Sequence, residues 1–184
     1  MKKLFGILAL VILMAVCLTS CALSVPRPEI KDGRFQFSVT YEVDGKQETV
    51  SGVFVCKFAK AVYEVGGVYR EWESYIEDDA LTARLEATRG YLLLKTTDDG
   101  EIYLDLNLSA KYFMADQHYE NSDMYGSPKA TGPRLFIEYT DAKYEEIAES
   151  SSEDAAVLAS YGVKVISFEY DEPIENSYSV FNFN

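Results

Sequence analysis

Apolar and polar residues alternate from Phe35 to Val43, and this alternation ends at Asp44-Gly45. A period of two places the apolar side chains on one face of a β-strand. Asp-Gly favours a two-residue hairpin turn, because both positions of that turn need a positive φ. We therefore predict an antiparallel hairpin whose register is set by the turn. The predicted pairs are Phe35 with Phe54, Phe37 with Gly52, and Val39 with Val50.

Further strands are predicted along the chain. A second hairpin is expected around Asp99-Gly100, with Leu93 opposite Leu106. Residues 53–56 are apolar on both faces, which indicates a strand inside its sheet. Four shorter segments also have the composition of strands: Val68–Ile76, Leu81–Ala87, Leu135–Tyr139 and Val163–Tyr170. The second of these segments is also compatible with a helix.

One helix is predicted over Ala155–Tyr161. Ser151 or Ser152 can cap its first turn, and Gly162 can end it. Residues 114–134 contain several Gly, Pro and Asn residues and predict a long irregular loop. Many short strands with few helices predict a mainly β domain, an antiparallel two-layer β-sandwich-like fold with one short helix. An α+β fold is the alternative.

The N-terminus has the layout of a secretory signal peptide. Lys2 and Lys3 precede an uncharged apolar run from Leu4 to Leu18. A helix needs about 20 apolar residues to cross a bilayer, and this run is shorter. An uncleaved N-terminal anchor is the alternative.

The signal ends in Leu18-Thr19-Ser20-Cys21, which resembles the lipobox of bacterial lipoproteins. In that family the cysteine thiol receives a diacylglyceryl group, and a peptidase cuts the chain just before the modified cysteine. The resemblance implies a signal peptide over residues 1–20 and lipidation of Cys21, which holds the protein on the outer face of the cell membrane. Cys17 is a poorer candidate, because it follows the branched Val16 and lies inside the apolar run.

Cleavage before the cysteine divides the chain into a lipidated tether, residues 21–31, and one globular domain, residues 32–184. Pro26-Arg27-Pro28 favours an extended, stiff tether. The mature chain has 15 basic and 30 acidic residues, a net charge of −15 with His118 neutral. This charge repels phosphate and argues against nucleic-acid binding and against electrostatic docking of the domain on anionic lipid. Cys56 is the one thiol left, so no internal disulfide is expected.

Four stretches of the mature chain resemble a family of small uncharacterised lipoproteins of Gram-positive gut bacteria. They are residues 37–46, 52–58, 133–141 and 168–176. The likeness runs over most of the mature chain and implies a Gram-positive-type envelope with a single membrane. It implies no activity.

No catalytic site, metal site or cofactor is predicted. Cys56 and His118 are the residue types of a nucleophile and its base, but Cys56 shares side-chain parity with Phe54. That parity points the thiol at the core, where thiols are inert. The chain has too few Cys and His residues for zinc, and the acidic residues 98–101 are already explained by the predicted turn.

Aromatic residues and the one histidine gather in the predicted irregular loop and just before it. Exposed rings there would stack on sugars or anchor a protein partner. The alternative is that these rings cover the core. The candidate contact residues are Tyr112, Phe113, His118, Tyr119 and Tyr125.

The sequence therefore predicts a non-enzymatic, lipid-anchored surface module that binds an unknown envelope protein or glycan. Its membrane partner is the bilayer that holds the acylated Cys21. The alternative is an envelope glycan hydrolase, which would act through two carboxylates about 5–10 Å apart.

Overall fold

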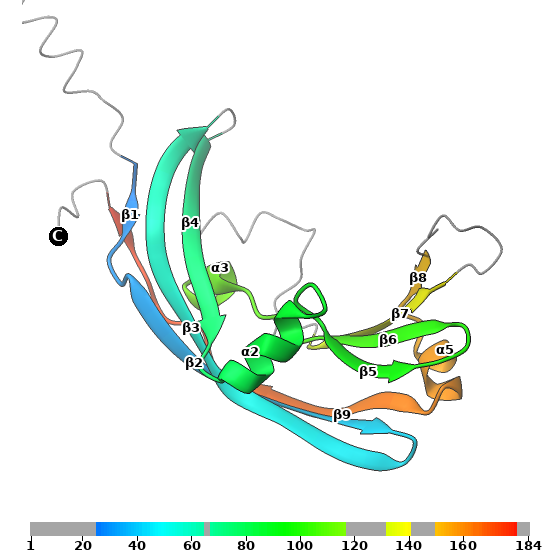
Figure 1. Cartoon of the computed structure of the whole chain (residues 1–184). Coiled ribbons are helices and arrows are strands. Elements are labelled where there is room, and N and C mark those ends of the chain that lie inside the picture. Colours follow the sequence, from blue (N-terminus) through cyan, green and yellow to red (C-terminus); the bar gives the residue numbers. More distant parts are fainter. Residues whose placement is uncertain (1–24, 65–66, 117–131, 141–149, 180–184) are drawn as a thin grey trace, which may run out of the picture.

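The computed structural model describes residues 25–64, 67–116, 132–140 and 150–179. Within these residues the chain forms two four-stranded antiparallel sheets and a short two-stranded one (Figure 1). The first sheet has the order β4-β3-β2-β9 and contains β2 (Asp32–Val43), β3 (Lys46–Glu64), β4 (Gly67–Ile76) and β9 (Val163–Tyr170). The second has the order β5-β6-β7-β8 and contains β5 (Leu92–Thr96), β6 (Gly100–Asp105), β7 (Arg134–Tyr139) and β8 (Ser150–Ser152).

The remaining elements are short. The two-stranded sheet joins β1 (Arg27–Pro28) to β10 (Tyr178–Ser179), and the helices are α2 (Asp79–Glu86), α3 (Ala110–Phe113) and α5 (Ala155–Ser160). The predicted mainly β, antiparallel, sandwich-like domain is confirmed. The described residues contain three short helices where the sequence predicted one.

The first hairpin forms with the predicted register. Asp44 and Gly45 have φ values of 51° and 81°, as the predicted turn requires. All three predicted pairs are present: Phe35 with Phe54, Phe37 with Gly52, and Val39 with Val50. The Phe37 ring lies 3.2 Å from the position that a Cβ of Gly52 would take, so the ring covers the glycine. β3 is flanked by β2 and β4, which confirms the predicted central strand.

The main core lies between the two large sheets. Side chains of β2 on the parity of Phe35 and Phe37 are buried and pack against Leu92 of β5 and Leu104 of β6. Cys56 is fully buried, as its parity predicted, and burial raises the pKa of its thiol to about 12. The thiol therefore stays protonated and inert at neutral pH.

The turn of the second hairpin differs from the prediction. Thr97 and Gly100 flank it: the Thr97 N–H donates to the Gly100 carbonyl at 2.8 Å, and the Gly100 N–H donates to Thr97 Oγ1 at 3.1 Å. The turn residues are thus Asp98 and Asp99, because the Thr97 hydroxyl closes the turn one residue earlier than Asp-Gly would. Gly100 has no positive φ and pairs in β6 instead.

The predicted contact of Leu93 with Leu106 is therefore wrong. Leu93 pairs with Tyr103, because the earlier turn shifts the register and an irregularity between Leu93 and Lys95 shifts it again. Leu106 follows the end of β6 and is buried in the main core. A bulge of this kind leaves no turn signature in the sequence.

Two of the predicted local elements are corrected. Residues 81–87 were predicted as a strand, but they fall mainly in α2, so the helical alternative is right. The Asp78 carboxylate accepts from the Leu81 N–H at 2.9 Å and caps this helix. The helix at 155–160 is confirmed, but its cap is Asp154, because Ser151 and Ser152 already belong to β8.

β3 and β4 run on past the sandwich as a long hairpin, which we call the arm (residues 57–64 and 67–73) (Figure 1). The pairing continues to Glu64 and Gly67, with an irregularity between Phe58 and Lys60. β1, β10 and α3 lie beside the arm (Figure 1). No helix in the described part of the chain is long and apolar enough to cross a membrane.

Gly45 and Gly100 should respond differently to substitution by asparagine. A Cβ at Gly100 would overlap the backbone carbonyl of Glu138 in β7, so Gly100→Asn should lower the free energy of unfolding by about 1–3 kcal/mol. Gly45→Asn is the control, because its φ of 81° suits Asn and nothing lies within 4 Å of the added Cβ. Urea unfolding of both variants measures the difference. Equal losses in the two variants would contradict the close-approach role of Gly100.

Candidate functional site

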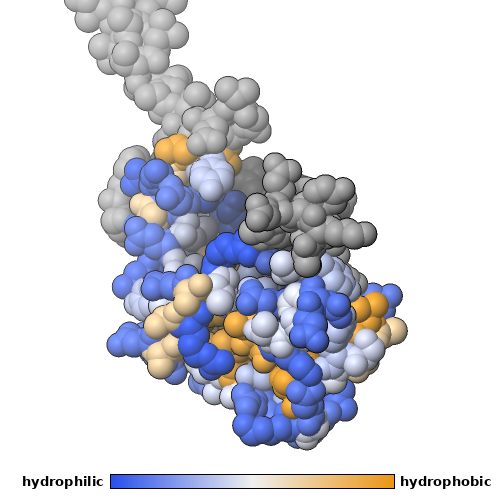
Figure 2. Space-filling view, turned by 45° about the vertical axis from the view of Figure 1, so that its right-hand side comes forward, coloured by the Kyte–Doolittle hydropathy of each residue, from blue (hydrophilic) through white to orange (hydrophobic). Residues whose placement is uncertain are grey.

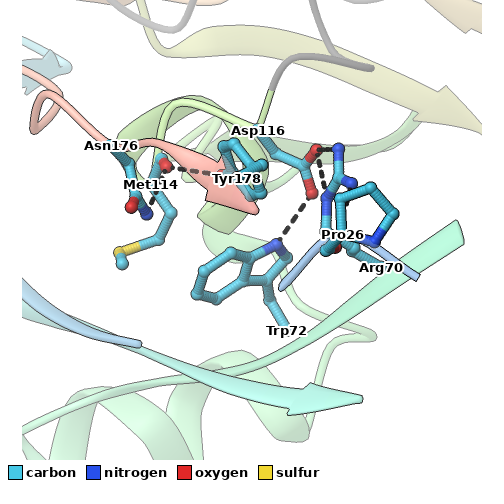
Figure 3. Close-up of polar contacts among 7 residues, drawn as sticks. All are labelled: Pro26, Arg70, Trp72, Met114, Asp116, Asn176 and Tyr178. Atoms are coloured by element: carbon cyan, nitrogen blue, oxygen red, sulfur yellow. Dashed lines mark hydrogen bonds and ion pairs between the residues drawn. The ribbon is translucent and has the colours of Figure 1, made fainter. Parts of the chain in front are cut away.

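A buried ion pair lies beside the middle of the arm, where Arg70 pairs with Ala61. Arg70 of β4 is 4% exposed and Asp116, after α3, is 2% exposed. Arg70 Nε and Nη2 donate to Asp116 Oδ1 at 2.9 and 2.6 Å, and Trp72 Nε1 donates to Oδ2 at 3.0 Å (Figure 3). Both carboxylate oxygens are thus satisfied, which a buried charge requires.

The backbone after α3 delivers Asp116 to this position. Ala115 has a φ of 49°, and the Asp116 N–H donates to the Lys111 carbonyl at 2.9 Å. A left-handed residue directly after a helix is a common way to end it and to reverse the chain. Asp116 therefore turns back toward the arm.

The same arginine also holds the N-terminal segment. Arg70 Nη1 donates to the Pro26 carbonyl at 3.4 Å, and the guanidinium carbon lies 4.2 Å from the centre of the Tyr178 ring (Figure 3). The Tyr178 hydroxyl donates to the Met114 carbonyl at 2.9 Å. Burial, followed by the Asp116 carboxylate, raises the pKa of Tyr178, so its hydroxyl remains a donor.

Asn176 joins the C-terminal segment to the N-terminal segment at Ile30. Its side-chain amide donates to the carbonyls of Ile30 at 2.9 Å and Met114 at 3.2 Å, and its Oδ1 accepts from the Ile30 N–H at 3.0 Å. Pro28 is buried between these contacts. Residues 26–30, which the sequence assigned to the tether, therefore pack on the domain.

The register shows in which direction the chain leaves the domain. The Lys31 carbonyl accepts from the Phe58 N–H at 2.7 Å, whereas Pro26 contacts Arg70, which pairs with Ala61. Going backward from residue 31 to residue 26, the chain moves along the arm toward its outer end. We call residues 26–31, together with residues 61–64 and 67–70 of the arm, the attachment end.

The outer face of the first sheet carries an open depression of about 800 Å³. Its floor is formed where two small residues pair directly, Ser38 of β2 and Ser51 of β3. Glu169 of β9 lies opposite Ser38 on the other side. The lining residues are Gln36, Phe37, Ser38, Ser51, Gly52, Val53, Phe168, Glu169, Tyr170 and Asp171. Hydroxyl, amide and carboxylate groups of this kind can bind polar ligands.

A second hollow of about 500 Å³ lies between α2 and the end of β6. Apolar side chains, among them Phe54 and Leu106, share it with Asn107 and Arg89. The volume is within the usual range for small-molecule sites. The Asn107 N–H donates to Asp105 Oδ1 at 2.7 Å, and its Nδ2 donates to the Gly132 carbonyl at 3.0 Å. These groups therefore form hydrogen bonds within the protein that hold the chain beside the hollow.

One pair of carboxylates faces across neighbouring strands. Glu101 of β6 pairs directly with Glu138 of β7. The Tyr103 hydroxyl donates to Glu101 at 2.5 Å, and Arg89 Nη2 donates to Glu138 at 2.7 Å. Burial, then the hydrogen bond to Glu101, raises the pKa of Tyr103 to about 12. Each acid already has a partner within the protein.

The predicted aromatic contact set is only partly within the described residues. Phe113 is fully buried and stacks on Phe35 at 4.7 Å between ring centres, so it is part of the core and unavailable to a partner. Tyr112 is half-buried and meets the Phe113 ring edge-on at 5.2 Å. Three candidates lie outside the described residues: His118, Tyr119 and Tyr125.

The predicted lipidation site also lies outside the described residues, as do all four lipobox positions, Leu18, Thr19, Ser20 and Cys21. In the part of the chain that is described, no three or more His, Cys, Asp or Glu side chains are placed to hold a metal ion.

The sequence reasoning missed the Arg70–Asp116 pair. A single signal was present: Arg70 shares side-chain parity with the apolar Val68 and Trp72 in the predicted strand. An arginine placed at core parity in a strand needs a buried acid. Nothing local in the sequence indicates which of the 30 acidic residues supplies it.

Comparison with family models, with curated proteins and with solved structures found no match to this chain.

The buried pair predicts a large effect of a small change. Asp116→Asn leaves the Arg70 charge buried without a counter-charge, so unfolding should become easier by about 3–5 kcal/mol. Glu71→Gln is the control, since Glu71 is the neighbour of Arg70 in β4 and forms an exposed pair with Lys60. Thermal or urea unfolding measures both variants.

A double variant tests whether the loss comes from the unpaired charge. Arg70→Met combined with Asp116→Asn removes both charges and should lose less stability than the two single losses added together. Additive losses would contradict a buried interaction between the two side chains.

Proposed function

We propose that this chain is exported, acylated on Cys21 and held on the outer face of the cell membrane, where its β domain acts as a non-enzymatic binding module. The observation that carries the proposal is the sequence Leu18-Thr19-Ser20-Cys21 at the end of an apolar run. Two acyl chains give a stable anchor, whereas a single chain binds weakly and reversibly. The Gram-positive-type setting follows from the family resemblance given above.

The attachment end supports this proposal. The chain contacts the domain from Pro26 onward, and Pro26 is five residues after Cys21 in the sequence. A chain segment of that length spans at most about 17 Å. A domain anchored in this way stays close to the membrane and presents its other end to the envelope.

The depression around Ser38 and Ser51 is the binding surface that we assign to this module. It lies in the part of the sheet away from the attachment end, because Ser51 is 13 residues before the end of β3. Glu169 and Asp171 line it and add to a net charge of −13 for the whole chain. A neutral or cationic envelope component fits this surface, and an anionic polymer is repelled.

The alternative function, an envelope glycan hydrolase, would use paired carboxylates. Glu101 and Glu138 are such a pair among the described residues. Their hydrogen bonds to Tyr103 and Arg89 leave neither acid free to serve as a proton donor or nucleophile without rearrangement. The binding module is therefore the better supported of the two.

The two N-terminal cysteines provide a direct test of the anchor. Cys21→Ala should abolish incorporation of labelled fatty acid and release the protein from the membrane fraction of the producing cell, because the acylated thiol is removed. Cys17→Ala is the matched control and should change neither result. Acyl labelling that persists in Cys21→Ala would overturn the assignment.

The depression can be filled without altering the sheet. Ser51→Tyr places a bulky side chain on its floor and should abolish crosslinking to an envelope component on intact cells and retention on purified cell-wall glycan. Gln47→Tyr is the control, since it lies exposed on the same strand outside the depression. Equal binding by both variants would exclude this surface. Release of sugar fragments from the glycan, lost in Glu101→Gln, would favour the hydrolase instead.

A further inference from the structure

The outer end of the arm is nearly uncharged. Residues 61–70 contain one acid, Glu64, and one base, Arg70, in a chain with 30 acidic and 17 basic residues. Arg70 is buried and paired with Asp116. This composition contrasts with the rest of the surface, whose negative charge keeps it away from anionic lipid.

The side chains at this end are apolar or amphipathic. Val62 pairs directly with Tyr69 across the arm, so the two share one face. Tyr69 lies beyond the sandwich core and is 42% exposed. Val62 and Val68 are half-buried. Figure 2 shows hydrophobic surface at the upper end of the molecule, where the arm ends and the N-terminal segment leaves. Tyrosine and apolar residues together are typical of protein surfaces at the membrane–water interface.

The position of the N-terminal segment indicates what this end meets. Pro26 lies level with the pair of Arg70 and Ala61, and the pairing ends three residues further on, about 10 Å along the arm. Cys21 is five residues before Pro26, a span of at most about 17 Å in the same direction. With the arm pointing at the membrane, even a fully extended tether leaves the end of the arm only about 7 Å short of the anchored cysteine. A path that is about 7 Å shorter brings the end of the arm level with the anchored cysteine.

We infer that the end of the arm, through Val62, Val68 and Tyr69, contacts the interfacial region of the same bilayer that holds the acylated Cys21. This inference rests on the proposed lipid anchor. The arm then acts as a second membrane contact, which fixes the orientation of the domain. The depression around Ser51 lies 11 residues from Val62 along β3, about 35 Å of strand away from this contact.

Two exposed tyrosines of β4 allow a matched test. Tyr69 is 42% exposed and has the Lys111 ammonium 4.8 Å from its ring centre, whereas Tyr75 is 44% exposed with Lys57 at 5.3 Å. They differ in their position along the strand, about 20 Å apart. The acylated protein is reconstituted with Tyr69→Cys or Tyr75→Cys, each labelled with a fluorophore, in phosphatidylcholine vesicles that contain lipids spin-labelled near the headgroup. Native Cys56 is buried and does not compete for the label.

Most of the fluorescence at position 69 should be quenched. The fluorescence at position 75 should be unchanged. Val62→Cys, on the paired strand, should behave like Tyr69→Cys and gives an independent label position if that variant folds poorly. Val62→Ser with Val68→Ser should reduce the quenching at position 69 while the protein still floats with the vesicles.

Flotation separates failure of the contact from failure of the anchor. If the acylated protein floats with the vesicles but positions 69 and 75 are quenched equally or not at all, the arm contact is disproved and the anchor stands. If the chain is not acylated on Cys21 and does not float, the proposed anchor fails, and the arm contact fails with it.

Discussion

The carboxylate of Asp116 receives three side-chain donors from the arm, two from Arg70 and one from Trp72. The same guanidinium reaches the carbonyl of Pro26 and lies on the Tyr178 ring, so one buried charge pair joins the arm, the loop after α3 and both terminal segments. A buried pair contributes little net stability compared with an apolar replacement, but it is specific, because each partner is costly to leave alone. At this end of the domain the pair holds the N-terminal segment in place, because Arg70 donates to the Pro26 carbonyl.

Local sequence rules predicted the first hairpin fully, because its turn and its strands give the same answer. Asp44-Gly45 supplies the positive φ values, and the period-two pattern allows only one face to be buried. The second hairpin was predicted with the wrong register for the opposite reason. Gly100 resembled a turn residue, but its small size is needed where the backbone of β7 passes close to it. That requirement arises from a strand more than 30 residues away and has no local signature.

The candidate site follows the same division between local and long-range information. The predicted lipobox is a contiguous motif, so local sequence is enough to propose it, whereas the pairing of residues 70 and 116 depends on how the fold closes. Burial of Cys56 was predictable from strand parity alone. Burial of Phe113 was not, because α3 is a single short helical turn whose Ser109 cap is a weak signal in isolation.

Under the proposed function, anchoring also changes the affinity that the binding module needs. A ligand confined to the same envelope layer meets a tethered domain at an effective concentration that short linkers raise to the millimolar range. An open, polar depression such as the one around Ser38 and Ser51 provides hydrogen bonds but little apolar burial, which suits weak binding. Under the proposed function, weak binding is sufficient, provided that the depression faces away from the bilayer. The contact of Pro26 with Arg70 supports that orientation, because the chain leaves the domain toward Cys21 at the end of the first sheet away from Ser38 and Ser51.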